Sequence, residues 1–175
     1  AGDPASPLQQ ALDICGSAIQ ETRALSRLLR PQILDDLGLE AALNWLARHS
    51  AESGGYEVEV DVAGLPAIDG DLSTLIFRVA QEALTNVLKH AHAKHVVIRL
   101  AQRHDEWLQF LVVDDGCGCD VDAAFAKASG GHSTGLASMR ERVRLFGGRF
   151  TVVSRPDEGM QLRVLIPLLQ GDAAP

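Results

Sequence analysis

The chain has 175 residues, of which 46% are hydrophobic and 22% charged, and it carries a formal net charge of −7. This length and composition allow one sizeable hydrophobic core with an appendage, and they argue against a disordered chain. They also argue against a nucleic-acid binder, because no block of Lys and Arg is present to neutralise a phosphate backbone. No stretch approaches the ~18 consecutive apolar residues that span a bilayer, so we expect a soluble chain without membrane contact.

Cysteine usage indicates the compartment. Three cysteines cannot form a disulfide framework, and the two in Cys117-Gly118-Cys119 are poorly spaced for a bridge. We therefore expect a cytoplasmic location, with these two thiols as small filling side chains rather than metal ligands. The sequence leaves open whether a longer parent protein is anchored to a membrane.

The first expected element is a helix from Pro7 to Arg30, in which apolar side chains recur at alternating spacings of four and three residues. Its apolar stripe is wider than one neighbouring helix requires. Pro31 ends this helix, and Leu34 to Gly38 forms a junction. A second helix is expected from Leu39 to Ser53.

A strand and a long helix follow. Tyr56 to Val62 alternates polar and apolar residues, as a half-buried strand does. Asp71 to Ala91 is expected to be one amphipathic helix, because its apolar residues fall at the i, i+3, i+4, i+7 spacing of one buried face.

The opposite face of the long helix carries a polar ladder. Its members recur every four positions and supply a guanidinium, a carboxylate, an amide and an imidazole: Arg78, Glu82, Asn86 and His90. A solvated face would more often hold Lys and Glu in bulk, so the ladder indicates a functional site. The alternative for Glu82 is a surface ion pair with Arg78, worth only about 0.3–0.5 kcal/mol.

Two strands, His95 to Gln102 and Glu106 to Val113, are expected to pair through a turn at Arg103-His104-Asp105. The second strand runs into Asp114-Asp115-Gly116-Cys117-Gly118. Glycines two residues apart let the backbone approach a ligand closely, and the preceding carboxylate accepts hydrogen bonds. The strand end is therefore a second candidate site.

A mobile segment and a helix start come next. Asp120 to His132 combines a short helical piece with Ser129-Gly130-Gly131, and we expect it to be mobile without a ligand. A helix beginning at Ser133-Thr134-Gly135-Leu136 ends at Gly147-Gly148. The free N–H groups and positive dipole end of such a helix start suit a phosphate.

Two closing strands are expected from Arg149 to Ser154 and from Met160 to Pro167. This order of helices and strands predicts an α+β fold. We expect a two-layer α/β sandwich, in which helices cover one face of a mixed sheet, with an additional N-terminal helix.

Taken together, the motifs resemble the ATP-binding catalytic domain of sensor histidine kinases, within the superfamily that includes gyrase, the Hsp90 chaperone and MutL. Phe77 to Ala93 is similar to the family's asparagine box, and Asp114 to Gly118 matches its first glycine box, D-x-G-x-G. Gly135 to Val143 is similar to the second glycine box, and Pro156 to Pro167 to the closing segment. Leu29 to Leu43 resembles the junction in kinases that serve response regulators of the NarL/LuxR type.

The resemblance implies a domain organisation. Residues 1–37 would be the second helix of a dimerisation hairpin with its junction, 38–170 the ATP-binding domain with a Bergerat-type fold, and 171–175 a disordered tail. The segment Asp120 to His132 would be the ATP lid.

It also implies roles for the site residues. Asn86 would hold the Mg²⁺ that bridges the ATP phosphates, since Mg²⁺ prefers hard oxygen ligands, and Glu82 would orient a metal-bound water or assist proton movement. Asp114 would accept a hydrogen bond from the exocyclic amine of adenine. The remaining nucleotide contacts would come from Lys89, His90, Gly116, Gly118, Thr134, Gly135 and Leu136. For Lys89, a solvated surface lysine is an equal alternative.

Two positions depart from the family pattern. Ser133 stands where the second glycine box begins with glycine, and Met160 stands where a threonine hydroxyl is expected near the adenine. One lost neutral hydrogen bond costs about 0.5–1.5 kcal/mol, so affinity would fall several-fold without being abolished.

The implied function is a protein histidine kinase that is a homodimer at full length. It would transfer the γ-phosphate of ATP to a histidine and then to an aspartate of a NarL/LuxR-type response regulator. The subfamily's acceptor histidine precedes an acidic residue in a helix ahead of Pro7, and the one such pair here, His104-Asp105, falls in a turn. We therefore expect the acceptor to be absent from this chain. The alternatives are an anti-sigma-type serine kinase and a degenerate nucleotide-binding or dimerisation module.

Overall fold

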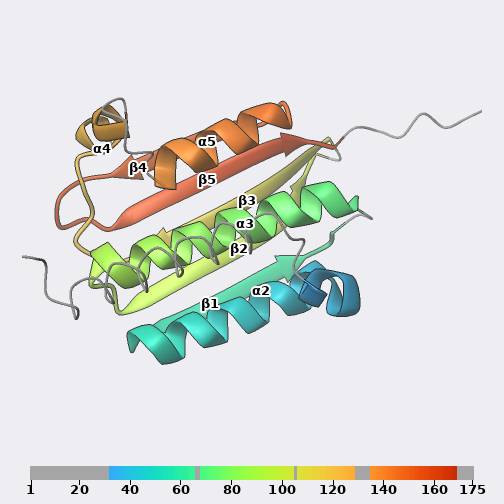
Figure 1. Ribbon diagram of the computed structural model, residues 1–175, viewed down its shortest axis with the longest axis horizontal. Coiled ribbons are helices and arrows are strands. Elements are labelled where there is room, and N and C mark those ends of the chain that lie inside the picture. Colours follow the sequence, from blue (N-terminus) through green and yellow to red (C-terminus); the bar gives the residue numbers. More distant parts are fainter. Residues whose placement is uncertain (1–31, 66–67, 105, 129–134, 169–175) are drawn as a thin grey trace, which may run out of the picture.

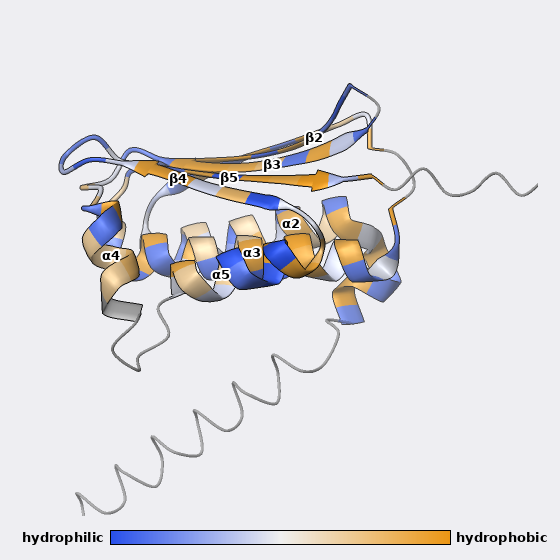
Figure 2. Ribbon diagram, turned by 90° about the horizontal axis from the view of Figure 1, so that it is seen from above, coloured by the Kyte–Doolittle hydropathy of each residue, from blue (hydrophilic) through white to orange (hydrophobic). Residues whose placement is uncertain are grey.

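The computed structural model describes residues 32–65, 68–104, 106–128 and 135–168. Within these ranges one sheet forms one layer and the helices form the other (Figure 1). Figure 2 shows that the helices of the described ranges all lie on the same face of the sheet. The expected N-terminal helix and C-terminal tail lie outside the described residues.

Five strands form the sheet in the order β1-β2-β3-β5-β4. Their bounds in chain order are Glu57–Ala63, His95–Arg103, Trp107–Asp114, Arg149–Ser154 and Met160–Pro167. β1 and β2 are parallel, and the other neighbours are antiparallel, so the sheet is mixed. Along β3 every second residue is buried, because helices cover one face of the sheet.

The helices of the described residues are α2, α3 with a π-helical turn η1, α4 and α5. Their bounds are Gln32–Gly54, Gly70–Asn86, Val87–Ala91, Val121–Ala128 and Gly135–Leu145. α2 is interrupted at Gly38, whose φ of 78° is not helical. α3 begins where the Asp69 carboxylate accepts a hydrogen bond of 2.6 Å from the Leu72 N–H, which satisfies one of the free donors of the first turn.

The core lies between the two layers. Its largest fully buried side chains come from α2, α3, α5 and the central strands, and they include Leu43, Ile76, Leu84, Ile98, Phe110 and Met139. The apolar face expected for the long helix is therefore the face that packs on the sheet. This packing fixes the rotation of α3 and the direction of its polar residues.

The α+β sandwich expected from the sequence is confirmed. Two details differ. Leu34 to Gly38, expected as a junction, belongs to a helix that begins at Gln32 and is interrupted at Gly38. The long helix changes from α to π geometry at Val87 instead of continuing regularly to Ala91. No helix within the described ranges is long and apolar enough to cross a membrane.

Candidate functional site

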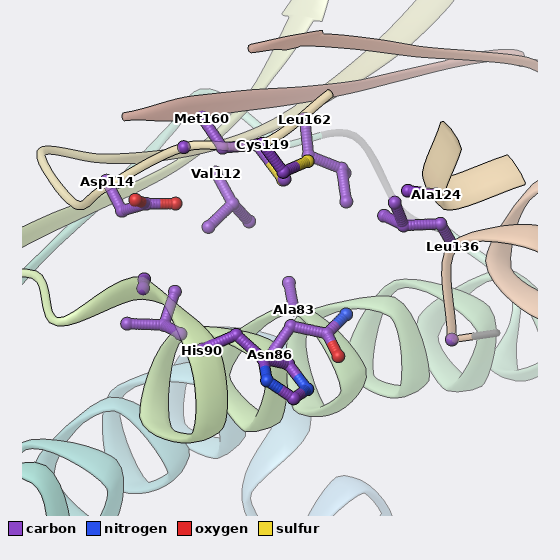
Figure 3. A pocket seen from close by; sticks show the side chains of 14 residues that line it. Ala83, Asn86, His90, Val112, Asp114, Cys119, Ala124, Leu136, Met160 and Leu162 are labelled. Atoms are coloured by element: carbon purple, nitrogen blue, oxygen red, sulfur yellow. The ribbon is translucent and has the colours of Figure 1, made fainter. Parts of the chain in front are cut away.

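A cavity of about 460 Å³ opens between the two layers near the carboxyl end of β3 (Figure 3). Its lining comes from both helical and sheet layers: Ala83, Asn86, Val87, His90, Ala91, Val112, Asp114, Gly118, Cys119, Ala124, Gly135, Leu136, Met160 and Leu162. Most of these side chains are apolar, and the volume lies in the range of roughly 300–1,000 Å³ typical of small-molecule sites. The cavity is therefore suited to a ligand with one apolar part and a few polar groups.

Asp114 supplies the polar group on the sheet side. It is the last residue of β3, it is 8% exposed, and one carboxylate oxygen accepts a hydrogen bond of 3.0 Å from the Gly116 N–H. Burial raises the pKa of the Asp114 carboxyl, although the hydrogen bonds from Gly116 and Met160 oppose this effect. Figure 3 shows the carboxylate directed into the cavity, where it presents an acceptor to a ligand.

Asn86 and His90 supply the polar groups on the helix side. Asn86 ends α3 and His90 lies one turn later in η1, and Figure 3 shows both on the helix layer, across the cavity from the sheet. Asn86 is half-buried and His90 is exposed. The cavity thus has a buried carboxylate at one side and an amide with an imidazole at the other.

The apolar lining near Asp114 forms a slot. Val112 and Leu162 lie on neighbouring strands, and Met160 is the register partner of Asp114. Cys119, expected as a small filling residue, also lines the cavity. An apolar slot that ends in one buried acceptor suits a flat heteroaromatic ring with an amino group.

The loop after β3 requires glycine at two positions for different reasons. Gly118 has φ +59°, and a Cβ there would come within 2.0 Å of the Arg155 carbonyl oxygen. At Gly116 a Cβ would come within 2.3 Å of the carbonyl oxygen of Ala91 in η1. The D-x-G-x-G motif therefore reflects close packing of the loop against η1 and the β4–β5 connection.

The π-helical turn is a site feature that the sequence did not indicate. Its carbonyl groups are bound by the loop: Ala91 accepts from the Cys117 N–H at 2.7 Å, and His90 accepts from the Cys117 thiol at 3.2 Å. Single π turns inside helices frequently occur at functional sites. Side-chain periodicity gives no sign of this turn, because the turn depends on contacts with a loop 26 residues further along the chain.

Asp115 holds the backbone in place, a structural role that the sequence pattern did not indicate. One carboxylate oxygen accepts from the backbone N–H groups of Lys94 and His95, at 2.7 and 2.9 Å, and the other lies 2.9 Å from the His95 ring Nδ1. These bonds lower the pKa of Asp115 to about 2 and connect the end of β3 to the start of β2. The two adjacent aspartates thus have separate roles, one facing the cavity and one holding the backbone.

The structure brings most of the expected site residues together. Six of them line the cavity: Asn86, His90, Asp114, Gly118, Gly135 and Leu136. Glu82 lies beside the cavity, since a Cβ at Gly135 would come within 2.1 Å of its Oε1. Lys89 is exposed on η1 outside the lining, and Thr134 lies outside the described residues.

The first member of the polar ladder does not line the cavity. Arg78 is 8% exposed, and its guanidinium donates a hydrogen bond of 2.8 Å to the side-chain oxygen of Gln81. The expected spacing is present, but only the C-terminal half of α3 reaches the cavity. Regular spacing alone therefore overestimated the extent of the site.

Comparisons with known proteins agree with this geometry. Residues 71–170 match the family described as histidine kinase-, DNA gyrase B- and HSP90-like ATPases. The sensor histidine kinase MctS of Rhizobium johnstonii is 35% identical over 94% of this chain and 35% of its own length. The sensor histidine kinase LiaS of Bacillus subtilis is 35% identical over 89% of this chain and 41% of its own length.

Solved structures of histidine kinases are also similar to this chain. The histidine kinase domain of the blue-light activated histidine kinase of Erythrobacter litoralis EL346 is 25% identical, with a TM-score of 0.62 over 75% of this chain and 62% of that chain. The histidine kinase AdeS of Acinetobacter baumannii shares the fold, with a TM-score of 0.67 over 97% of this chain and 88% of that chain at 13% identity.

The chain therefore belongs to the histidine kinase-, DNA gyrase B- and HSP90-like ATPase family, and within it to the ATP-binding catalytic domains of two-component sensor histidine kinases. It spans only about a third to two fifths of the length of the curated relatives MctS and LiaS.

Proposed function

We propose that the cavity binds Mg·ATP, with the adenine in the apolar slot and the phosphates towards Asn86 and His90. The observation that carries this proposal is the buried Asp114 carboxylate at the end of the slot, across from two polar residues of the helix layer. An acceptor in an apolar slot discriminates strongly for a ligand that donates to it, because either partner left unpaired costs free energy.

The donor set of the helix layer fits Mg²⁺ shared with phosphates. The Asn86 side-chain oxygen is a hard ligand, and Mg²⁺ usually keeps several waters and binds proteins through one or two side chains when phosphates supply the rest. Bound there, Mg²⁺ would neutralise phosphate charge. His90 would contact the phosphates, and Lys89 would reach them from the exposed side of η1.

Glu82 is proposed to act on protons at the phosphate end. Its carboxylate stands next to Gly135, where α5 begins, and Gly135 and Leu136 line the cavity. Phosphates bound by the free N–H groups of this helix start would lie near the Glu82 carboxylate, and we propose Thr134, which precedes Gly135 in the sequence, as a further phosphate contact. From there Glu82 would orient a metal-bound water or take a proton from the attacking group.

In the full-length protein, this domain would present the γ-phosphate to a histidine on a dimerisation hairpin. Phosphohistidine would then pass its phosphoryl group to an aspartate of a response regulator. The resemblance of Leu29 to Leu43 to the junction of one kinase subfamily supports a regulator of the NarL/LuxR type and a homodimer. We propose a cytoplasmic location for the domain.

Calorimetric titration tests the site. Asp114→Asn should weaken ATP and ADP binding by at least about tenfold with or without Mg²⁺, because it removes a charged acceptor. Asn86→Ala should weaken binding only when Mg²⁺ is present. Asn44→Ala is the matched control, because Asn44 is exposed on α2 and donates to the Glu40 carbonyl.

Unchanged affinity in Asp114→Asn would contradict the placement of the adenine, and equal losses in Asn86→Ala with and without Mg²⁺ would contradict the metal role. Met160 in the slot lining favours a second candidate, a degenerate module that holds nucleotide poorly. Absence of nucleotide binding to the unmodified chain would select that candidate.

A further inference from the structure

A second hollow lies on the face of the sheet that the helices of the described residues leave uncovered (Figure 2). Figure 2 shows the helices on one side only, so the outward side chains of the strands face away from them. At the end of the sheet away from Asp114, a hollow of about 450 Å³ is lined by Arg103, His104, Trp107, Gln109, Arg149 and Leu165. We call it the arginine–tryptophan hollow.

The strand register explains why these side chains converge. Arg103 on β2 is the partner of Trp107 on β3, and Leu165 on β5 is the partner of both Gln109 on β3 and Arg149 on β4. Paired residues of neighbouring strands point to the same face. Four strands therefore contribute side chains to one place.

Both guanidinium groups are held in position. The Arg103 Nε donates a hydrogen bond of 2.8 Å to the Gln109 side-chain oxygen. The Arg149 Cζ lies 5.9 Å from the centre of the Trp107 ring, within the range of a cation–π contact. Such contacts reduce the conformational entropy that each side chain would lose on binding a ligand.

The hollow has the opposite charge to the chain as a whole. The chain carries a net charge of −7, yet the described residues of the lining include two arginines, one histidine and no carboxylate. Elsewhere on the sheet Arg99 pairs with Asp61 at 3.7 Å. Within the part of the chain that the structure describes, no carboxylate forms an ion pair with Arg103 or Arg149.

We propose that the arginine–tryptophan hollow is a docking surface for an acidic segment of a partner protein, in which carboxylates flank one apolar side chain. Guanidinium groups match carboxylates in a two-point geometry, and Trp107 with Leu165 would receive the apolar side chain. Tryptophan and arginine are the residue types that most often dominate the energy of protein interfaces. The hollow has nearly the same volume as the nucleotide cavity but is more open to solvent, so a small molecule there would stay largely exposed, which favours a protein segment.

Tryptophan fluorescence tests the proposal on the whole chain. The chain has two tryptophans, so Trp45→Phe leaves Trp107 as the one reporter. The probe is a capped peptide of two glutamates, one leucine and two glutamates, and its lysine counterpart is the control peptide. The acidic peptide should change Trp107 emission in a saturable way at low ionic strength, and the lysine peptide should not.

Variants identify the surface. Arg103→Glu and Arg149→Glu should each weaken peptide binding by at least about tenfold. Arg48→Glu makes the same charge change on the exposed part of α2 and should leave binding unchanged. Circular dichroism checks that each variant is folded. Arg149→Lys keeps the positive charge but lacks the two-point donor geometry of a guanidinium, and it should give an intermediate affinity.

Three results would overturn the proposal. One is an equal loss in Arg48→Glu, which would mean that only net charge matters. The second is displacement of the bound peptide by inorganic phosphate at a concentration lower than that of the peptide, which would make the hollow a small-anion site. The third is a change in Trp107 emission with chain concentration alone, which would identify a second copy as the occupant. None of these results depends on the nucleotide site.

Discussion

Asp114 and Asp115 are adjacent in sequence and lie in opposite environments. Asp114 is buried at the cavity, and its pKa is raised mainly by desolvation. Asp115 is exposed, and its pKa is lowered to about 2, mainly by the His95 backbone N–H, with contributions from the His95 ring and the Lys94 N–H. Successive residues at the end of a strand point to opposite sides, which is why one aspartate can face a ligand while its neighbour holds the backbone.

The lowered pKa of Asp115 makes a prediction about stability and pH. A carboxyl whose pKa is lower in the folded state stabilises the fold above its unfolded pKa of 3.8, and this contribution is lost as pH falls towards about 2. Between these values the free energy of unfolding should fall less steeply in Asp115→Asn than in the unmodified chain. Chemical denaturation at a series of pH values measures the free energy of unfolding of both proteins. Because Asp114 is present in both, its contribution largely cancels in the difference between them.

Asp36→Asn is the matched control for this experiment. Asp36 is exposed on α2, and its replacement removes the same charge from the chain. The pH profile of this variant should run parallel to that of the unmodified chain. Parallel profiles for Asp115→Asn as well would show that the bonds to Lys94 and His95 do not favour the ionised form.

At the scale of elements, the site depends on the fit between η1 and the loop after β3. The loop binds the carbonyls of the π turn, and Gly116 and Gly118 leave room for backbone on either side. Neither element would hold this conformation alone, because a π turn leaves backbone groups that need outside partners.

Gly118→Ala tests this fit. An alanine at φ +59° is strained, and its Cβ would also come within 2.0 Å of the Arg155 carbonyl oxygen. Gly64→Ala is the control, because Gly64 has φ +57° and open space around it. We expect Gly64→Ala to cost about 1 kcal/mol from strain alone and Gly118→Ala more than about 3 kcal/mol, measured by denaturation. Equal losses in the two variants would show that the loop moves freely to admit a side chain.

The helices and strands could be predicted from the sequence, whereas the local breaks in them could not. Strands and helices followed from periodicity, because one covered face of a sheet imposes a period of two and one covered face of a helix a period near 3.6. The kink at Gly38 and the π turn did not follow from periodicity, and the π turn depends on hydrogen bonds from the distant loop after β3. Periodicity alone also did not indicate that Arg78 is buried while Asn86, two turns later, lines the cavity.

At the scale of the whole molecule, the cavity and the arginine–tryptophan hollow lie at opposite ends of the sheet and on opposite faces. The pair Val96 and Asp114 marks the cavity end of the β2–β3 ladder, and the pair Arg103 and Trp107 marks the other end. A partner held at the hollow would therefore leave the nucleotide cavity accessible. The hollow and the cavity are independent features, and a variant in one should leave binding at the other unchanged.

The separation between the two ends of the sheet also bears on phosphoryl transfer within the chain. His104, the one histidine followed directly by an acidic residue, lies in the β2–β3 turn. Arg103 lies seven residue steps along β2 from Val96, the partner of Asp114, and at about 3.3 Å per step this span is roughly 23 Å. Because phosphoryl transfer requires the attacking atom within about 3–3.5 Å of the phosphate, His104 cannot accept phosphate from a nucleotide bound in the same cavity.

We therefore expect the chain to bind Mg·ATP and yet fail to phosphorylate itself. After incubation with γ-³²P-ATP and Mg²⁺, acid-labile radioactivity on the chain should not exceed that on Asn86→Ala, while calorimetry shows nucleotide bound to the unmodified chain. A longer protein that adds the dimerisation hairpin with its histidine is the positive control and should become labelled. Acid-labile label on the chain alone would contradict the expectation, and its loss in His104→Ala would then show transfer between two copies, since the distance rules out transfer within one.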